Sequence, residues 1–536
     1  MKLPELSESA APEFSDAATC KAWLENVPLA NVAAAQGELL YQLREFNRFP
    51  GAAAPRLAVM EALREAVNFV QIEQAKRFTN RALPMAKAEA EIFEATVSLW
   101  EQMRLGYARC LEAALNGDAG TRSQGALICQ RLLAYNGLKM FHHYRAYRQV
   151  PLADWQALHR DFAAAEELDV VEDGVKDFLN RDIHDTSPLI AYSRAVLMGM
   201  TNPNELSQRQ LTFVAYLLER WAGKLEVTMQ PADDSEAMSP LVADLASDQC
   251  PQRAAEPRPA REPRYLDTRS LAKSLRNRVA LLRKGESPAK LALGEDCVQP
   301  SCEQLLVYLY RQWCQPRQVR ASDRRAAGAK VEACTEMAAI HYYVSGRVFR
   351  PPAEQTELTQ KQRDEIATFG RVRTREADDY SNAQGFVYEE WELEDESAQG
   401  MRVVRRAKSE GKRLSHGQLI GVRLVEEQKF MLGQVRWLMS AANGDLHAGV
   451  KLLPGLPSPL AVRAIGLNVQ QSAWSPALGL TAVAALSAPA SMVLPSGWFK
   501  PKRLIEVHAE RGARALLTEV LERGIDFERV AYETAR

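Results

Sequence analysis

Two arginines and a short Asp-Ser-Gly cluster stand close together in the last third of the chain. Arg371 and Arg375 form an RxxxR pair, and Asp395, Ser397 and Gly400 follow as DxSxxG. A guanidinium can grip a phosphate, stack on a base or pair with the acceptor edge of guanine. A carboxylate accepts from a guanine N–H, a serine hydroxyl donates or accepts beside it, and a glycine permits positive φ and close backbone approach. A ligand that combines phosphates with guanine bases would use all five residues.

The two motifs differ in how specific they are. The RxxxR spacing also occurs at Arg320/Arg324 and Arg402/Arg406, where exposed faces or strand ladders are the simpler interpretation. DxSxxG occurs once, but an Asp-Ser-Gly cluster after a strand is most often a tight turn. The order of the features is the stronger signal: an arginine pair, a polar loop, a strand, the DxSxxG turn and then more strands.

In this order the segment resembles the bacterial PilZ domain, a cytosolic receptor module for cyclic di-GMP. The family pattern is RxxxR followed, across one strand, by [D/N]xSxxG. The downstream runs "HGQLIGVRL", "LGQVRWL" and "DLHAGVKLL" are similar to the later strands of that family. The resemblance covers about Glu365 to Val462 and leaves the N-terminal region, which is predicted to be helical, unassigned.

The resemblance implies a role for each motif residue. Arg371 and Arg375 would hold the phosphates and stack on the guanines. Asp395 and Ser397 would contact a guanine edge, and Gly400 would shape the turn.

Further charged residues surround the arginine pair. Arg373 lies between the two arginines and would add a contact. Glu376, Asp378 and Asp379 follow and would pair with the arginines in the empty state, which would either lower the affinity or provide a placeholder that the ligand displaces. We therefore expect the ligand to order the loop from about 363 to 380, which is sufficient for a switch without chemistry.

Other candidate groups give weaker indications. His142 and His143 are adjacent on an expected helix, so they point about 100° apart and do not share one metal face. We expect structural roles for both. His184 lies near Asp182 and Asp185, but no GxSxG elbow accompanies it.

The sequence contains none of the common signatures of enzymes or cofactor sites. There is no Walker loop, no dinucleotide-binding glycine motif, no kinase set and no GG[D/E]EF signature of the enzymes that make cyclic di-GMP. The sequence predicts no enzyme, no metal site and no cofactor, and the resemblance implies cyclic di-GMP as the ligand.

The elements that must position the motifs are indicated by the hydrophobic period. Apolar residues recur three and four apart through 1–223, which predicts an all-α region without a fixed repeat. Residues 224–268 read as a linker or small irregular β insert, and helical periodicity returns over 269–350. Over 360–498 the period becomes two, which predicts a six- to seven-stranded antiparallel barrel, PilZ-like by the resemblance. Residues 499–536 add a strand, "RLIEVHAE", and a helix, "ARALLTEVLERG". The predicted fold class is multidomain α + β.

Composition limits the partners and the compartment. Lys and Arg number 67 against 68 Asp and Glu, so we expect neither polymeric nucleic acid nor an anionic membrane as the main partner. The start lacks a signal-peptide pattern. The most apolar window, "ALGLTAVAALSAPASMVL", is broken by Pro489 and is interpreted as buried strands with a turn instead of a membrane span. The eight cysteines, Cys297 and Cys302 included, are expected to be reduced thiols.

Together these features predict a cytoplasmic bacterial effector that binds cyclic di-GMP and rearranges its domains. The helical region would then engage an unidentified protein partner, in motility, pilus or biofilm control by analogy with the family. Two alternatives stay open: a ligand-independent scaffold or adaptor, and an enzyme with its site in the helices. Self-association is also left open.

Overall fold

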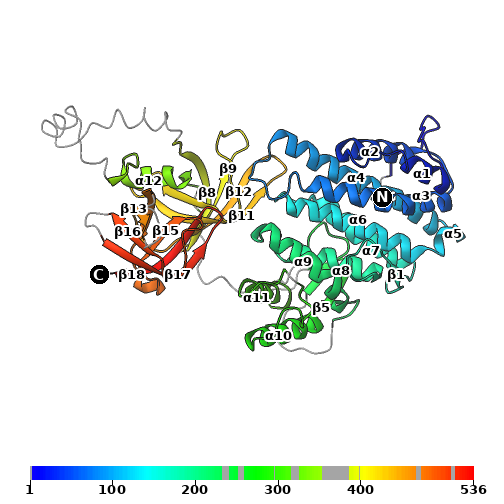
Figure 1. Ribbon diagram of the computed structural model, residues 1–536. Helices are drawn as coiled ribbons and strands as arrows, with labels where there is room; N and C mark the ends of the chain where they lie inside the picture. Colours follow the sequence, from blue (N-terminus) through cyan, green and yellow to red (C-terminus); the bar gives the residue numbers. More distant parts are fainter. Residues whose placement is uncertain are drawn as a thin grey trace. The chain divides into compact units, whose positions relative to one another are not determined.

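The computed structural model describes the chain except residues 1–2, 232–240, 252–258, 295, 316–324, 327, 353–385, 398, 466–472, 509–512 and 536. The chain forms two compact units (Figure 1). Unit 1 comprises Met1–Arg81 and Met85–Val319, and unit 2 comprises Ala82–Pro84 and Arg320–Arg536. The predicted order, a helical N-terminal region followed by β-barrel structure, is confirmed.

Unit 1 is mainly helical. Helix α9 starts at the capping box that the sequence predicts: the Ser207 hydroxyl accepts from the Gln210 amide, and the Gln210 side chain accepts from the Ser207 amide. The helices are α1 (Ala17–Leu24), α2 (Val32–Arg48), α3 (Ala53–Ala75), α4 (Lys87–Leu115), α5 (Ala119–Arg122), α6 (Gly125–Arg145), α7 (Leu152–Glu167), α8 (Pro188–Met200), α9 (Gln208–Trp221), α10 (Arg269–Arg283) and α11 (Ser301–Cys314).

Helix α6 contributes to two hydrophobic cores. One side of it buries Ile128 and Leu132 against α1 to α4. The other side buries Leu133 and Met140 against the helices from α7 to α11. A helix that is apolar on two sides must lie between two layers, which explains its central place in unit 1.

The segment expected as a linker or β insert forms a small sheet. Strands β3 (Glu226–Thr228), β5 (Pro263–Asp267) and β4 (Leu241–Asp244) pair in that order. Leu241 and Leu266 are buried in the same core as the later helices. The sheet is therefore an integral layer of unit 1.

Unit 2 contains two six-stranded barrels. In the first, a further β8–β9 pairing closes the six strands β8-β7-β10-β11-β12-β9 into a ring, and the short strand β6 pairs with β8 outside that ring. Closure leaves no unpaired edge between these strands. The strands are β6 (Arg325–Ala326), β7 (Lys330–Thr335), β8 (Glu389–Ser397), β9 (Gly400–Arg405), β10 (Leu419–Leu424), β11 (Met431–Ser440) and β12 (Leu446–Leu452).

The second barrel follows directly. Its closed order is β13-β14-β15-β18-β17-β16, around a core that includes Val462, Leu494 and Val530. Helix α12 (Met337–Ser345) packs Ile340 into a cluster with residues of both barrels, such as Leu419 and Leu478. The strands are β13 (Pro457–Ala464), β14 (Ser475–Leu480), β15 (Ser491–Pro495), β16 (Leu504–His508), β17 (Ala513–Arg523) and β18 (Phe527–Ala535).

Three predictions about elements were wrong. The strands expected in a single barrel over 360–498 divide between two, because a period of two does not specify which strands pair. Residues 330–335, which were predicted to be helical, form strand β7. "ARALLTEVLERG" is strand β17 and not a helix: Ala515 and Leu517 are buried alternately between β16 and β18, and this pairing overrides helix propensity.

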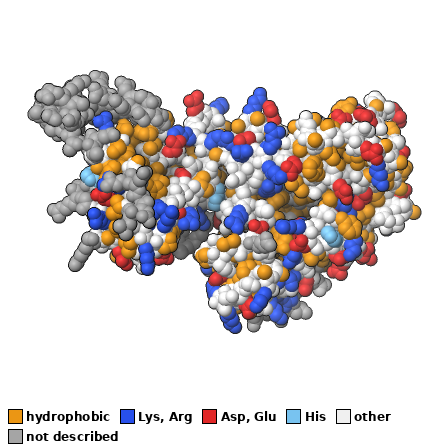
Figure 2. Space-filling view, viewed as in Figure 1, with side chains coloured by type: hydrophobic (Ala, Val, Ile, Leu, Met, Phe, Trp, Pro, Cys, Tyr) orange, Lys and Arg blue, Asp and Glu red, His pale blue; other side chains and the backbone are white. Residues whose placement is uncertain are grey.

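The cysteine prediction was wrong in one pair. Cys297 and Cys302 form a disulfide, with Cα atoms 5.0 Å apart, because the chain folds back where α11 begins at Ser301. The other six cysteines are free thiols. The apolar window forms β14 and β15, as predicted, and no helix in the described part of the chain is long and apolar enough to cross a membrane. In the view of Figure 2, acidic and basic side chains are interspersed, which fits the near-zero net charge.

Candidate functional site

The DxSxxG motif forms the hairpin that joins β8 to β9. Ser397 is the last residue of β8 and pairs with Gly400, the first residue of β9. The Ser397 hydroxyl donates to the Gly400 carbonyl oxygen at 3.1 Å. Further from the turn, Asp395 pairs with Arg402 on the opposite strand. The structure thus brings the three motif residues together in the turn that the sequence predicted.

Gly400 is required for close approach and not for a positive φ. Its φ lies outside the left-handed region. A Cβ at this position would lie 2.5 Å from the Val450 carbonyl oxygen on the neighbouring strand β12. Any side chain here would therefore push β9 away from β12. The expected close backbone approach is present, and the expected positive φ is not.

Asp395 stands at the end of a row of residues that crosses four adjacent strands. It pairs with Arg402 on β9, Arg402 pairs with Gly449 on β12, and Gly449 pairs with Trp437 on β11. Directly opposite residues in antiparallel strands point to the same face of a sheet. We call these four residues the barrel row.

The barrel row forms a flat aromatic surface beside a cation. A Cβ on Gly449 would lie 1.8 Å from the Trp437 indole nitrogen, so the indole lies over the glycine. The guanidinium carbon of Arg402 is 5.9 Å from the centroid of the Trp437 ring, within cation–π range. Trp437 is half-buried, so part of its side chain remains exposed.

Acidic residues already pair with the arginines on this face. Glu394 forms an ion pair with Arg402 and lies 3.4 Å from the His447 ring nitrogen Nδ1. Burial lowers the pKa of His447, although the Glu394 carboxylate opposes that shift. Arg406 pairs with Asp445 at 2.8 Å and also with Glu392. An anionic ligand would therefore compete with Glu394 for Arg402.

The predicted arginine residues fall outside the described residues. Arg371, Arg373 and Arg375 all lie within 353–385, as do the acids that follow them. Their roles stay predictions.

Sequence reasoning missed three members of the barrel row. Arg402 was interpreted as an exposed or ladder residue, and Trp437 and Gly449 were not selected. Gly449 was the available signal, because a glycine inside a strand marks a place where a ligand or another group comes close. That Trp437 is the cross-strand partner of Gly449 could not be predicted without knowing the register of β11 and β12.

The histidine candidates have structural environments. His142 and His143 lie on α6 and are 4% and 7% exposed. Burial lowers the pKa of His142 to about 3 and that of His143 to about 4, so both rings are neutral at pH 7. The His184 carbonyl accepts from the Asp177 amide, and Asp182 pairs with Arg220. Among the described residues no group of three or more His, Cys, Asp or Glu could hold a metal ion.

Comparison with known proteins covers both ends of the chain. Residues 18–233 match the family described as "Cyclic-di-GMP receptor FimW, N-terminal domain", and residues 460–535 match "FimW C-terminal beta-barrel domain". The cyclic-di-GMP receptor FimW of Pseudomonas aeruginosa strain PAO1 is 22% identical in an alignment that spans 96% of this chain and 90% of that protein. The chain is a homologue of FimW.

The FimW matches assign regions that the sequence left open. Apart from Ala82–Pro84, the N-terminal match lies within unit 1, so the helices with no predicted family match the FimW N-terminal domain. The C-terminal match coincides with the second barrel, to which the strand and misassigned helix of 499–536 belong. The first barrel, with DxSxxG and the barrel row, lies between the two matches.

Proposed function

We propose that this protein is a cytoplasmic receptor for cyclic di-GMP and that the ligand binds on the barrel row of the first barrel. Homology to a protein named as a cyclic-di-GMP receptor supports the ligand class. The observation that carries the location is the alignment of Asp395, Arg402 and Trp437 over Gly449, next to the DxSxxG turn.

Each residue of the row suits one part of the ligand. The Asp395 carboxylate accepts from the N–H donors on a guanine edge. The Ser397 hydroxyl already donates to the Gly400 carbonyl, so it meets the ligand as an acceptor. The Trp437 indole stacks on a guanine, as aromatic side chains do with every base.

The arginines supply the charge that the phosphates need. Arg402 lies beside Trp437 and can turn its remaining N–H donors to a phosphate while Glu394 holds the opposite side. Arg371 and Arg375, with Arg373 between them, grip the phosphates from the segment that precedes β8. In this proposal binding is a matter of stacking and charge pairing, and no bond in the ligand is broken.

The output follows from ordering the arginine segment on the barrel. A ligand that contacts this segment only in the bound arrangement shifts the protein toward that arrangement. We propose that unit 1 then engages a protein partner, in motility, pilus or biofilm control. No bound cofactor or metal takes part in this switch.

The test is calorimetric titration of cyclic di-GMP into the full chain, with GTP and cyclic di-AMP as competitors of related chemistry. We expect micromolar or tighter binding, about −8 kcal/mol, that is lost in Arg371→Ala/Arg375→Ala. The matched control is Arg44→Ala/Arg48→Ala, which removes an RxxxR pair at exposed positions of α2 and should leave binding unchanged. No heat with the wild-type protein would overturn the proposal and favour a ligand-independent scaffold.

A further inference from the structure

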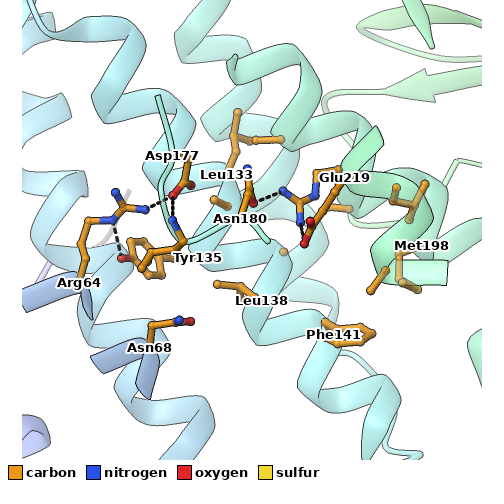
Figure 3. Close-up of a pocket in the computed structure, with 18 residues that line it drawn as sticks. Arg64, Asn68, Leu133, Tyr135, Leu138, Phe141, Asp177, Asn180, Met198 and Glu219 are labelled. Carbon is orange, nitrogen blue, oxygen red and sulfur yellow. Dashed lines mark hydrogen bonds and ion pairs between the residues drawn. The ribbon is translucent and has the colours of Figure 1, made fainter. Parts of the chain in front are cut away.

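Unit 1 contains a cavity of about 230 Å³ that the barrel site does not involve. It lies between α3, α6, α8 and α9, and one wall is the segment 177–180 (Figure 3). An engineered apolar cavity of about 150 Å³ is large enough to hold benzene. This cavity therefore has room for a small aromatic molecule that carries a substituent.

Most of the cavity wall is apolar. Leu138 and Phe141 of α6 and Met198 of α8 line one side. Helices α6, α8 and α9 each contribute small residues to the lining. A Cβ added at Gly137 would lie 3.5 Å from the Ala195 Cβ. The small lining residues are Ala134, Gly137, Ala191, Ala195 and Ala215.

The charged lining residues compensate one another. Arg64 binds Asp177 at 2.6 Å. Arg194 lies 3.6 Å from Glu219 and donates to the Asn180 side-chain oxygen at 2.8 Å. Two cations face two carboxylates, so a charged ligand would give up its hydration without meeting an unpaired opposite charge. The wall therefore disfavours ions of either sign.

One polar side chain remains available to a ligand. Within the described residues, the Asn68 amide forms no hydrogen bond, and it points into the cavity from α3. A carboxamide both donates and accepts. Asn68 is half-buried, so water satisfies the amide until a ligand of matching polarity replaces it.

We propose that this cavity is a second ligand site, for an uncharged small molecule with an apolar, ring-sized body and a head that both donates and accepts hydrogen bonds. The body occupies the apolar side near Phe141 and Met198, and the head pairs with Asn68. All of its residues belong to unit 1, so it shares no residue with the proposed cyclic di-GMP site.

The first experiment measures ligand-observed fluorine NMR of three matched probes with the full chain and no nucleotide. The probes are 4-fluorobenzamide, 4-fluorobenzoate and 4-fluorobenzylammonium. We expect 4-fluorobenzamide to bind with a dissociation constant below about 1 mM and both ions to bind at least tenfold more weakly. No binding of 4-fluorobenzamide, or equal binding of the three probes, would overturn the proposal.

The second experiment locates the bound probe. Ala134→Met and Ala215→Met fill the cavity from α6 and α9, and each should weaken 4-fluorobenzamide binding at least fivefold. The matched control is Ala280→Met, at an exposed position of α10, which should change nothing. Thermal unfolding checks that each variant is folded. If only one of the two filling variants folds, that variant alone is sufficient to locate the probe.

Asn68→Leu tests the head separately. It should weaken 4-fluorobenzamide about tenfold while fluorobenzene, which has no head, binds as before. Unchanged 4-fluorobenzamide binding in the filling variants or in Asn68→Leu would place the probe elsewhere and overturn the assignment. None of these outcomes depends on cyclic di-GMP, so failure here and failure of the receptor proposal are distinguishable.

Discussion

The two barrels of unit 2 carry similar sets of side chains. In the first barrel Arg402 lies over Trp437, and in the second the Arg463 guanidinium carbon is 4.6 Å from the ring centroid of Trp474. A glutamate and a histidine complete each set: Glu394 and His447 in the first barrel, Glu506 and His508 in the second.

The surroundings of the two sets differ. Trp437 lies over a glycine in the middle of a strand, in line with the Asp395 carboxylate and beside DxSxxG. Trp474 precedes β14, and the second barrel has no DxSxxG motif. An arginine against a tryptophan is thus ordinary packing by itself, and only its alignment with a carboxylate and a glycine makes it a candidate site. Matched substitutions in the two barrels test this difference.

The largest expected effect is that of Gly400→Ala. The added Cβ meets the Val450 backbone oxygen at 2.5 Å, so β9 must shift away from β12. We expect a loss of about 2 kcal/mol in the free energy of unfolding and about hundredfold weaker cyclic di-GMP binding, because the turn is displaced.

Gly479→Ala in the second barrel is the control for this change. Its added Cβ meets the Ser458 hydroxyl at 2.9 Å, and a side chain can move. Chemical denaturation and calorimetry of the two variants should separate them clearly. Equal stability losses would show that the close approach at Gly400 is not special.

The next effect is that of Arg402→Gln. This change removes a cation from the barrel row and leaves Glu394 facing the phosphates. We expect about thirtyfold weaker binding, corresponding to about 2 kcal/mol for a charge-assisted contact. Arg463→Gln removes the partner of Glu506 and should leave the affinity within twofold; a comparable loss would move the site toward the second barrel.

Trp437→Leu should weaken binding about tenfold, because stacking on one base contributes about 1–3 kcal/mol. Fluorescence adds a direct readout, since ligand stacking should quench the emission of Trp437. Trp474→Leu is the matched control and should keep both the affinity and the quenching. Quenching that disappears with Trp474 instead would reverse the assignment of the two barrels.

The smallest expected effect is a pH dependence through His447. Burial holds its pKa below the usual value, so the ring is neutral at pH 7. Bound phosphates favour the charged ring, so the pKa rises on binding and the affinity increases as the pH falls. Between pH 7 and pH 5 we expect a gain of about threefold or less, measured by calorimetry.

His447→Gln should abolish this pH dependence, and His508→Gln should preserve it. An affinity that falls with acidification would contradict the assigned role of His447, because the sign follows from the direction of its pKa change.

The helical region and the hairpin could be predicted from local sequence. The three- and four-residue spacing of apolar side chains identified unit 1 as α-helical, and the capping box at Ser207 identified the start of α9. The DxSxxG residues were expected at a turn after a strand and lie there. These features depend on interactions between residues a few positions apart, which the sequence contains directly.

The rest depended on contacts between distant segments. "ARALLTEVLERG" has the composition of a helix, and only its pairing with β16 and β18 makes it a strand. The Cys297–Cys302 disulfide likewise depends on how the chain enters α11. Local propensity is worth less than the ladder hydrogen bonds and burial that a closed barrel provides.

By itself the sequence determined the order of the helical and β regions, the DxSxxG turn and the residue types suited to phosphates and guanine. Only the tertiary structure decided that there are two barrels and that Asp395, Arg402, Gly449 and Trp437 share one row. The physical reason is strand register: a shift of one residue would turn Trp437 to the opposite face, and register is fixed by packing between strands far apart in the chain.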